Sequence, residues 1–132
     1  MDDERNDELP SPELRAFIYS CIDSVEQVQV LDLLSSSDDA WTARGVAEQA
    51  SMSDATARHH LESMAARGLV AITVASETSY RYAPKTDALR RYGDQLVAQY
   101  RRAPMSVIRL IANNVAPSVK RIADAFRLRD RR

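Results

Sequence analysis

Apolar residues recur in the N-terminal part of the chain at spacings of three and four, the period of an amphipathic helix. One such stretch begins after Ser11, which is suited to cap a helix that has Pro12 at its first position. Its apolar face consists of four side chains: Leu14, Phe17, Ile18 and Cys21. A second stretch covers residues 25–34, where Asp23 and Glu26 have the spacing of a capping box. The pattern therefore predicts two consecutive helices.

Two shorter helices are predicted next, separated only by Ser51 and Met52. Thr42 is expected to cap the first, which runs to about residue 50, and Ser53 to cap the second. The buried stripe predicted for the second helix has members four and three residues apart: Ala57, Leu61 and Met64. Gly68 should end this helix, because a left-handed residue is typical at that place.

After these helices the pattern changes to that of strands. Residues 69–74 and 79–83 are rich in β-branched and aromatic side chains and are joined by a polar stretch. They predict a β-hairpin, with Tyr80 and Tyr82 on one face as packing residues. The dipeptide Ala40-Trp41 is too short for a strand of its own, but it is expected to pair at the base of the hairpin, with Trp41 as a core anchor.

The predicted order is helix, short strand, helix, tight turn, helix and two-stranded hairpin. This is a mostly α fold with a small β-hairpin wing, the order of a winged helix-turn-helix. The stretch TARGVAEQASMSDATARHHLESMAARGLV resembles the DNA-binding core of bacterial MarR-like and ArsR-like transcriptional regulators, in its capped second helix and its terminal R-G-L. The resemblance covers residues 25–84 and implies a winged domain that binds duplex DNA.

In a helix-turn-helix the first helix braces the second, so the second can project from the protein surface. The major groove of DNA is wide enough to admit one such helix. The candidate DNA contacts lie off the buried stripe of that helix and on the hairpin: Ser53, Asp54, Thr56, Arg58, His59 and Arg81. Arg58 suits guanine and Arg81 suits phosphate or the minor groove. Without the winged context, Arg58 is an ordinary solvated side chain, and Asp54 an acidic residue that favours the helix dipole.

The adjacent pair His59-His60 raises the question of a metal site. Neighbouring residues of a helix point about 100° apart, so the two rings are badly placed to hold one ion. No metal site is expected, and His60 is predicted to be a partly buried packing residue.

Charge is distributed unevenly along a chain whose net charge is −1. Residues 1–13 hold six acidic groups and one Arg, net −5, whereas residues 85–132 hold twelve Lys or Arg and four Asp, net +8. Residues 40–84 balance four basic groups against four acidic ones. A neutral helix-turn-helix is unusual for a protein that contacts phosphates. It leaves open an alternative function, a winged-helix protein-interaction module that docks another regulator without binding DNA.

The expected organisation is an acidic flexible lead over 1–11, a winged domain with an accessory helix over 12–84, and a helical dimerisation region over 85–132. Seven apolar residues of the last region would form a large exposed patch on a monomer: Val107, Ile108, Ile111, Val115, Val119, Ile122 and Phe126. We therefore expect a homodimer that reads an inverted repeat. The alternative is that these helices pack on their own winged domain.

Other function classes find little support in the sequence. There is no nucleophile elbow, glycine-rich phosphate loop or paired His-carboxylate cluster, so no enzyme activity and no cofactor are expected. Cys21 is the single cysteine, which excludes paired-cysteine metal sensing. The absence of a long apolar run or a signal-peptide pattern predicts no membrane partner and a cytoplasmic location. An unidentified small-molecule effector at the dimer interface remains open.

Overall fold

The computed structural model describes residues 10–113. Within this range the elements follow in the order α2 (Pro12–Cys21), α3 (Val25–Ser35), α4 (Ala43–Ala50), α5 (Asp54–Ala66), β1 (Val70–Thr73), β2 (Ser79–Tyr82) and α6 (Asp87–Arg102), and residues 104–113 are again helical. The predicted helices and hairpin of this range are confirmed. No helix among the described residues is long and apolar enough to span a membrane.

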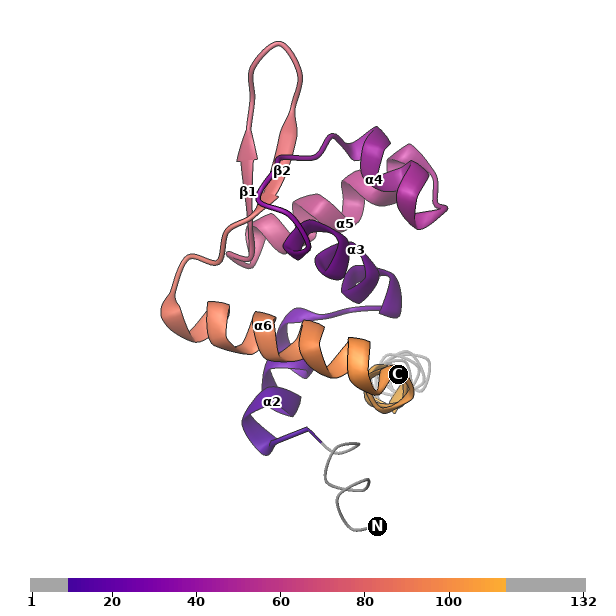
Figure 1. Ribbon diagram of the computed structural model, residues 1–132, viewed down its shortest axis with the longest axis vertical. Helices are drawn as coiled ribbons and strands as arrows, with labels where there is room; N and C mark the ends of the chain where they lie inside the picture. The colour runs from indigo at the N-terminus through magenta and orange to yellow at the C-terminus, as the bar shows by residue number, and fades with distance from the viewer. Residues whose placement is uncertain (1–9, 114–132) are drawn as a thin grey trace, which may run out of the picture.

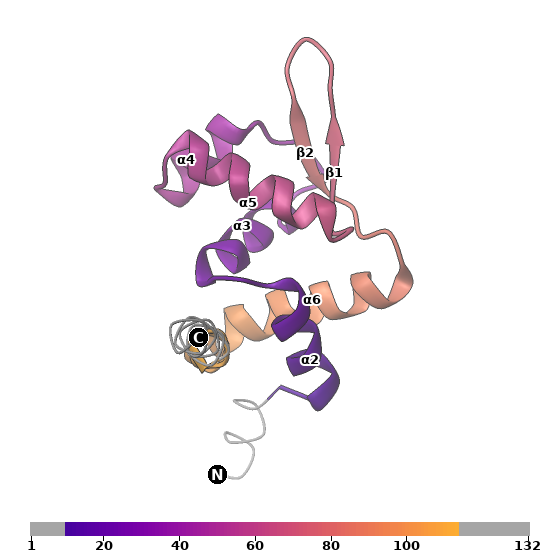
Figure 2. The same ribbon diagram turned by 180° about the vertical axis from the view of Figure 1, so that it is seen from behind.

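The elements are stacked from the hairpin at one end to α2 at the other (Figures 1 and 2). The hairpin projects at one end, with α4 and α5 beside its base, and α6 crosses on the other side of α3. Helix α5 packs against α3, α4 and β1, while α6 packs against α2 and α3. As a result, the hairpin lies at the opposite end of the molecule from α2, whereas Arg67 at the C-terminal end of α5 donates to the carbonyl of Cys21 at the end of α2.

The N-terminal caps were predictable because each depends on a residue and its near neighbours. In α2, α4 and α5 the predicted cap accepts a hydrogen bond from the backbone N–H three residues later, and these caps are Ser11, Thr42 and Ser53. Thr86 caps α6 in the same way. These side chains satisfy N–H groups that would otherwise have no partner within the helix.

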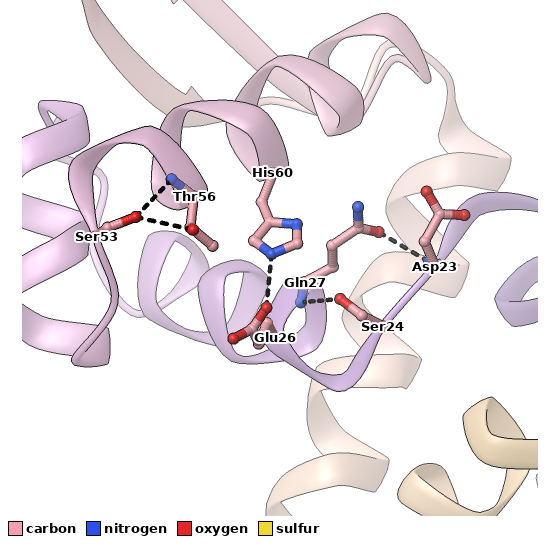
Figure 3. Close-up of polar contacts among 7 residues, drawn as sticks. All are labelled: Asp23, Ser24, Glu26, Gln27, Ser53, Thr56 and His60. Carbon is pink, nitrogen blue, oxygen red and sulfur yellow. Dashed lines mark hydrogen bonds and ion pairs between the residues drawn. The ribbon is translucent and has the colours of Figure 1, made fainter. Parts of the chain in front are cut away.

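The predicted capping box of α3 is wrong by one residue. Ser24, not Asp23, is the cap, and its Oγ accepts from the backbone N–H of Gln27 at 3.4 Å. Gln27 in turn accepts at Oε1 from the backbone N–H of Asp23 at 2.9 Å (Figure 3). Serine and aspartate are both good caps, so sequence spacing alone did not separate these neighbours. The shift leaves the carboxylate of Glu26 available for a contact outside its own helix.

The predicted buried stripe of α5 is confirmed. Ala57, Leu61 and Met64 are fully buried and belong to the main hydrophobic core. Gly68 takes the left-handed conformation with φ of 84°, and the backbone N–H of Leu69 donates to the carbonyl of Met64 at 3.0 Å. This C-terminal turn folds the chain back and leads directly into β1. One side of α5 is therefore fixed against the core.

The hairpin pairs in antiparallel register, with Val70 opposite Tyr82 and Thr73 opposite Ser79. Trp41 extends it by one bridge, exchanging two backbone hydrogen bonds of 2.7 Å with Tyr80. The pairing predicted for Ala40-Trp41 is thus confirmed, and Trp41 packs against the core from a half-buried position. The bridge ties the loop before α4 to the base of the hairpin.

The C-terminal part of the described chain corrects one expectation. Val107 and Ile111 were expected to be exposed on a monomer, but they are buried within the protomer, at 0% and 3% exposure. They belong to the same hydrophobic core as buried residues of α3 and α5, and their helix, 104–113, begins just after the end of α6. Ile108 is half-buried. Four of the seven apolar residues lie outside the described residues: Val115, Val119, Ile122 and Phe126.

The hairpin is also tied to α6, by Tyr82. Its hydroxyl donates to Asp94 Oδ1 at 2.7 Å, and burial together with this hydrogen bond raises the pKa of Tyr82, so the phenol remains a donor at neutral pH. Gly93 is the residue that allows this approach, because a Cβ added there would lie 2.5 Å from Tyr82 Oη. The contact links the hairpin to the helix that follows it.

Replacing Gly93 with alanine tests this contact. An alanine in a helix interior normally gains about 0.5–1 kcal/mol over glycine. In Gly93→Ala we expect no gain, because the new methyl group displaces the Tyr82 hydroxyl and breaks its hydrogen bond. In the Tyr82→Phe background the clash is absent, and the same substitution should stabilise by the usual amount. Urea unfolding of the four proteins measures the difference; an equal gain in both backgrounds would contradict the contact.

Candidate nucleic-acid interface

The start of α5 holds the first of the predicted site residues. Ser53 Oγ accepts from the backbone N–H of Thr56 at 3.0 Å and donates to Thr56 Oγ1 at 2.8 Å (Figure 3). Ser53 is exposed, whereas Thr56 is half-buried, so it is less open to a partner than its place in the sequence suggested. The hydroxyl proton of Thr56 remains able to donate to an external acceptor.

The exposed side of α5 carries three more of the predicted residues, Asp54, Arg58 and His59. Asp54 lies in the first turn, where its charge suits the helix dipole, and its carboxylate is 3.9 Å from Arg44 Nε. With 54% and 79% of the two side chains exposed, this ion pair adds little stability. Arg58 makes no hydrogen bond or ion pair within residues 10–113. Its guanidinium is thus available to an external partner.

Arg81 lies apart from the α5 residues. On β2 it alternates with Tyr80 and Tyr82, which point toward the core, so its exposed side chain is on the opposite face of the hairpin. In the register it stands opposite Ala71. The structure therefore gathers Ser53, Asp54, Arg58 and His59 at one end of α5 but leaves Arg81 on a separate surface.

A groove of about 480 Å³ separates α5 from the hairpin. Two of its lining residues are basic, Arg44 and Arg58, and three are acidic, Asp54, Glu62 and Glu77. The charge in the groove is therefore slightly negative. Such a surface gives no general attraction to phosphates.

The hairpin side of the groove carries two exposed apolar side chains. Ile72 and Val74 are 42% and 78% exposed, and both line the groove across from α5. The sequence predicts a strand for both residues but no role in the site. Their spacing of two residues was a signal that they share a face, but only the register with Tyr80 shows that this face is turned toward α5.

His60 points away from this surface. It is buried, and its Nε2 lies 3.0 Å from Glu26 Oε1 across the space between α5 and α3 (Figure 3). His59, by contrast, is exposed. The expected packing role of His60 is confirmed, but the contact with Glu26, 34 residues away in sequence, was missed. Residues 10–113 contain no group of three or more His, Cys, Asp or Glu side chains placed to hold a metal ion.

Known structures share this arrangement. A homodimeric winged helix-turn-helix DNA-binding domain from Mycobacterium bovis, described as a possible ArsR-family transcriptional regulator, matches with 25% identity and a TM-score of 0.50, over 66% of this chain and 80% of that one. The protein has a winged helix-turn-helix fold. Its helix-turn-helix is α4 with α5, and its wing is the β1–β2 hairpin.

Two MarR family regulators have the same winged helix-turn-helix fold. One, from Silicibacter pomeroyi, matches with 24% identity and a TM-score of 0.50, over 77% of this chain and 72% of that one. The other, from Rhodococcus sp. RHA1, matches with 18% identity and a TM-score of 0.53, over 86% of this chain and 80% of that one. The predicted resemblance to winged regulators of the MarR and ArsR type is thus confirmed at the level of the fold.

A family model matches part of the winged helix-turn-helix by sequence. The model for the IclR helix-turn-helix domain matches residues 28–71, which run from α3 into β1. The match covers the helix-turn-helix and ends before most of the wing. A comparison with curated proteins found no significant match.

Proposed function

We propose that this protein is a DNA-binding transcriptional regulator that acts as a homodimer and reads an inverted repeat through α5 and the wing. One observation carries the proposal. Helix α5 is held by the fully buried Ala57, Leu61 and Met64, and its other side presents Arg58 and His59 to solvent. A helix fixed on one side and exposed on the other suits insertion into the major groove.

Two observations support the homodimer: the similarity to a homodimeric domain of known structure and the exposure of an apolar side chain in the C-terminal region. The similar Mycobacterium bovis domain is described as homodimeric and DNA-binding. Two copies of α5 related by a two-fold axis would read half-sites about 34 Å apart, one turn of DNA. We assign dimerisation to the region 85–132. Val107 and Ile111 contribute little because they are already buried, whereas Met105 is 54% exposed and available to a second copy.

The proposal also covers location and ligands. A regulator of this kind works in the cytoplasm, where its DNA lies, and needs no catalytic residue or cofactor. Its basic C-terminal region, with net charge +8 over residues 85–132, would supply the attraction to phosphates that the neutral region 40–84 lacks. A small-molecule effector at the dimer interface is compatible with this function.

A second function is favoured by the charge of the groove. Three carboxylates against two guanidinium groups, with exposed Ile72 and Val74 beside them, suit a protein partner better than a polyanion. In this alternative the winged domain docks another regulator and binds no DNA. The wing would then be an interaction surface through its apolar face.

A titration with DNA at two salt concentrations separates these functions. We expect the full-length protein to bind a fluorescent duplex from the region upstream of its own gene. Its affinity should fall by more than about tenfold between about 50 and 200 mM salt, because each phosphate contact releases a counterion. Fluorescence anisotropy measures the affinity. Analytical ultracentrifugation excludes aggregates and should show two protomers per duplex. A folded dimer that binds none of the upstream fragments at either salt concentration would favour the docking function.

A further inference from the structure

Glu62 stands out on the exposed side of α5. It lies one helical turn after Arg58, both side chains are exposed, and both line the groove beside the wing. Neither makes a hydrogen bond or ion pair within residues 10–113. An arginine four residues before a glutamate is the less favourable order for a helical ion pair, which agrees with the two groups staying apart.

Three other carboxylates of the winged domain have a contact or a position that explains them. Glu26 contacts His60 at 3.0 Å, Asp23 contacts Arg67 at 3.2 Å, and Asp54 serves the helix dipole beside Arg44. Glu62 has no such contact and lies past the first turn, where the dipole no longer favours an acid. A carboxylate here repels phosphates, so on a DNA-reading helix its presence calls for a compensating contact.

The major groove offers that contact. A carboxylate only accepts hydrogen bonds, and cytosine presents its N4 amino group there as a donor, whereas guanine presents the two acceptors that suit arginine. Side chains one turn apart on a helix are separated by about 5.4 Å along its axis, and neighbouring base pairs by about 3.4 Å. Arg58 and Glu62 therefore suit bases one or two steps apart.

We propose that Glu62 is a specificity-determining residue that accepts a hydrogen bond from cytosine N4, beside a guanine bound by Arg58. This inference rests on the proposed DNA-binding function. It assigns the half-site a G·C pair at two nearby positions. It also gives the acidic residue a role in selecting sequence, at the cost of weaker attraction to DNA in general.

The test begins with selection of the preferred duplex from a pool with a randomised core, using the full-length wild-type protein. Each base pair of the selected half-site is then replaced singly, and affinities are measured for wild type, Glu62→Gln and Glu48→Gln. Glu48 is exposed on α4, does not line the groove, and gives the same change of charge. Circular dichroism confirms that the variants keep their helices.

In wild type, one cytosine close to the Arg58-dependent guanine should be preferred by about tenfold. Glu62→Gln should reduce that preference to about twofold without lowering affinity for random-sequence DNA, while Glu48→Gln keeps it. If Glu62→Gln and Glu48→Gln show the same base preferences at every position, Glu62 does not select cytosine, although the proposed DNA binding stands. If wild type binds neither the pool nor any upstream fragment, the proposed function fails, and this inference fails with it.

Discussion

Arg58→Ala should remove the preference of the protein for its own operator before it removes binding to DNA. Arg58 is exposed, makes no hydrogen bond or ion pair within the described part of the chain, and points about 100° away from the buried Ala57. A bidentate contact from arginine to guanine contributes about 1–3 kcal/mol of discrimination. We therefore expect the ratio of affinities for operator and random duplex to fall by about tenfold or more.

The control for this prediction is Arg90→Ala. Arg90 is an exposed arginine on α6, so the substitution removes the same charge away from α5. It should weaken binding to operator and random duplex by similar factors, because only the general attraction to phosphates changes. Anisotropy titrations with both duplexes give the ratios. An unchanged ratio in Arg58→Ala would exclude this side chain from base reading.

Leu61→Ala should lower the free energy of unfolding by about 2–5 kcal/mol. Leu61 is fully buried at the centre of α5, in the core shared with α3 and β1. Removing its side chain loses apolar contacts and leaves a cavity between packed elements that have little freedom to close it. Urea unfolding followed by circular dichroism measures the change.

The neighbouring substitution Glu62→Ala is the matched control for stability. Its side chain is exposed and makes no hydrogen bond or ion pair within the described residues, so its effect should stay within about 0.5 kcal/mol. Comparable losses in Leu61→Ala and Glu62→Ala would mean that α5 is not anchored by its apolar stripe. The orientation of the whole exposed side would then be in doubt.

Local signals explain why most of the fold was predictable. A cap such as Thr42 or Ser53 and a turn such as Gly68 depend on residues within a few positions, and the stripe of α5 depends only on helical period. Where two neighbours compete, as Asp23 and Ser24 do, the same local rules give an answer that is one residue off.

Long-range packing explains what the sequence did not predict. The contact of His60 with Glu26 joins residues 34 positions apart, and nothing in either neighbourhood indicates it. Burial of Val107 and Ile111 depends on where helix 104–113 turns after α6. Apolar periodicity shows that a face must be covered, but it does not say whether the covering surface belongs to the same protomer or to another.

In the candidate site, too, local features were predictable and features that depend on long-range packing were not. That Arg58 and His59 lie outside the buried stripe followed from helical period alone. The position of Arg81 on the far face of the hairpin needed the register of β1 and β2, and the acidic lining of the groove needed the packing of the wing beside α5. Sequence reasoning therefore gave the helix that faces outward, but not the surface that surrounds it.

An amide NMR titration with the operator duplex is the most direct test of whether the outer side of α5 meets DNA. The largest shift changes are expected at residues 53–62 and in the wing, with small changes in α2. Changes concentrated in α2 and α6, with residues 53–62 unmoved at saturation, would show that DNA binds elsewhere and would contradict the assignment of α5.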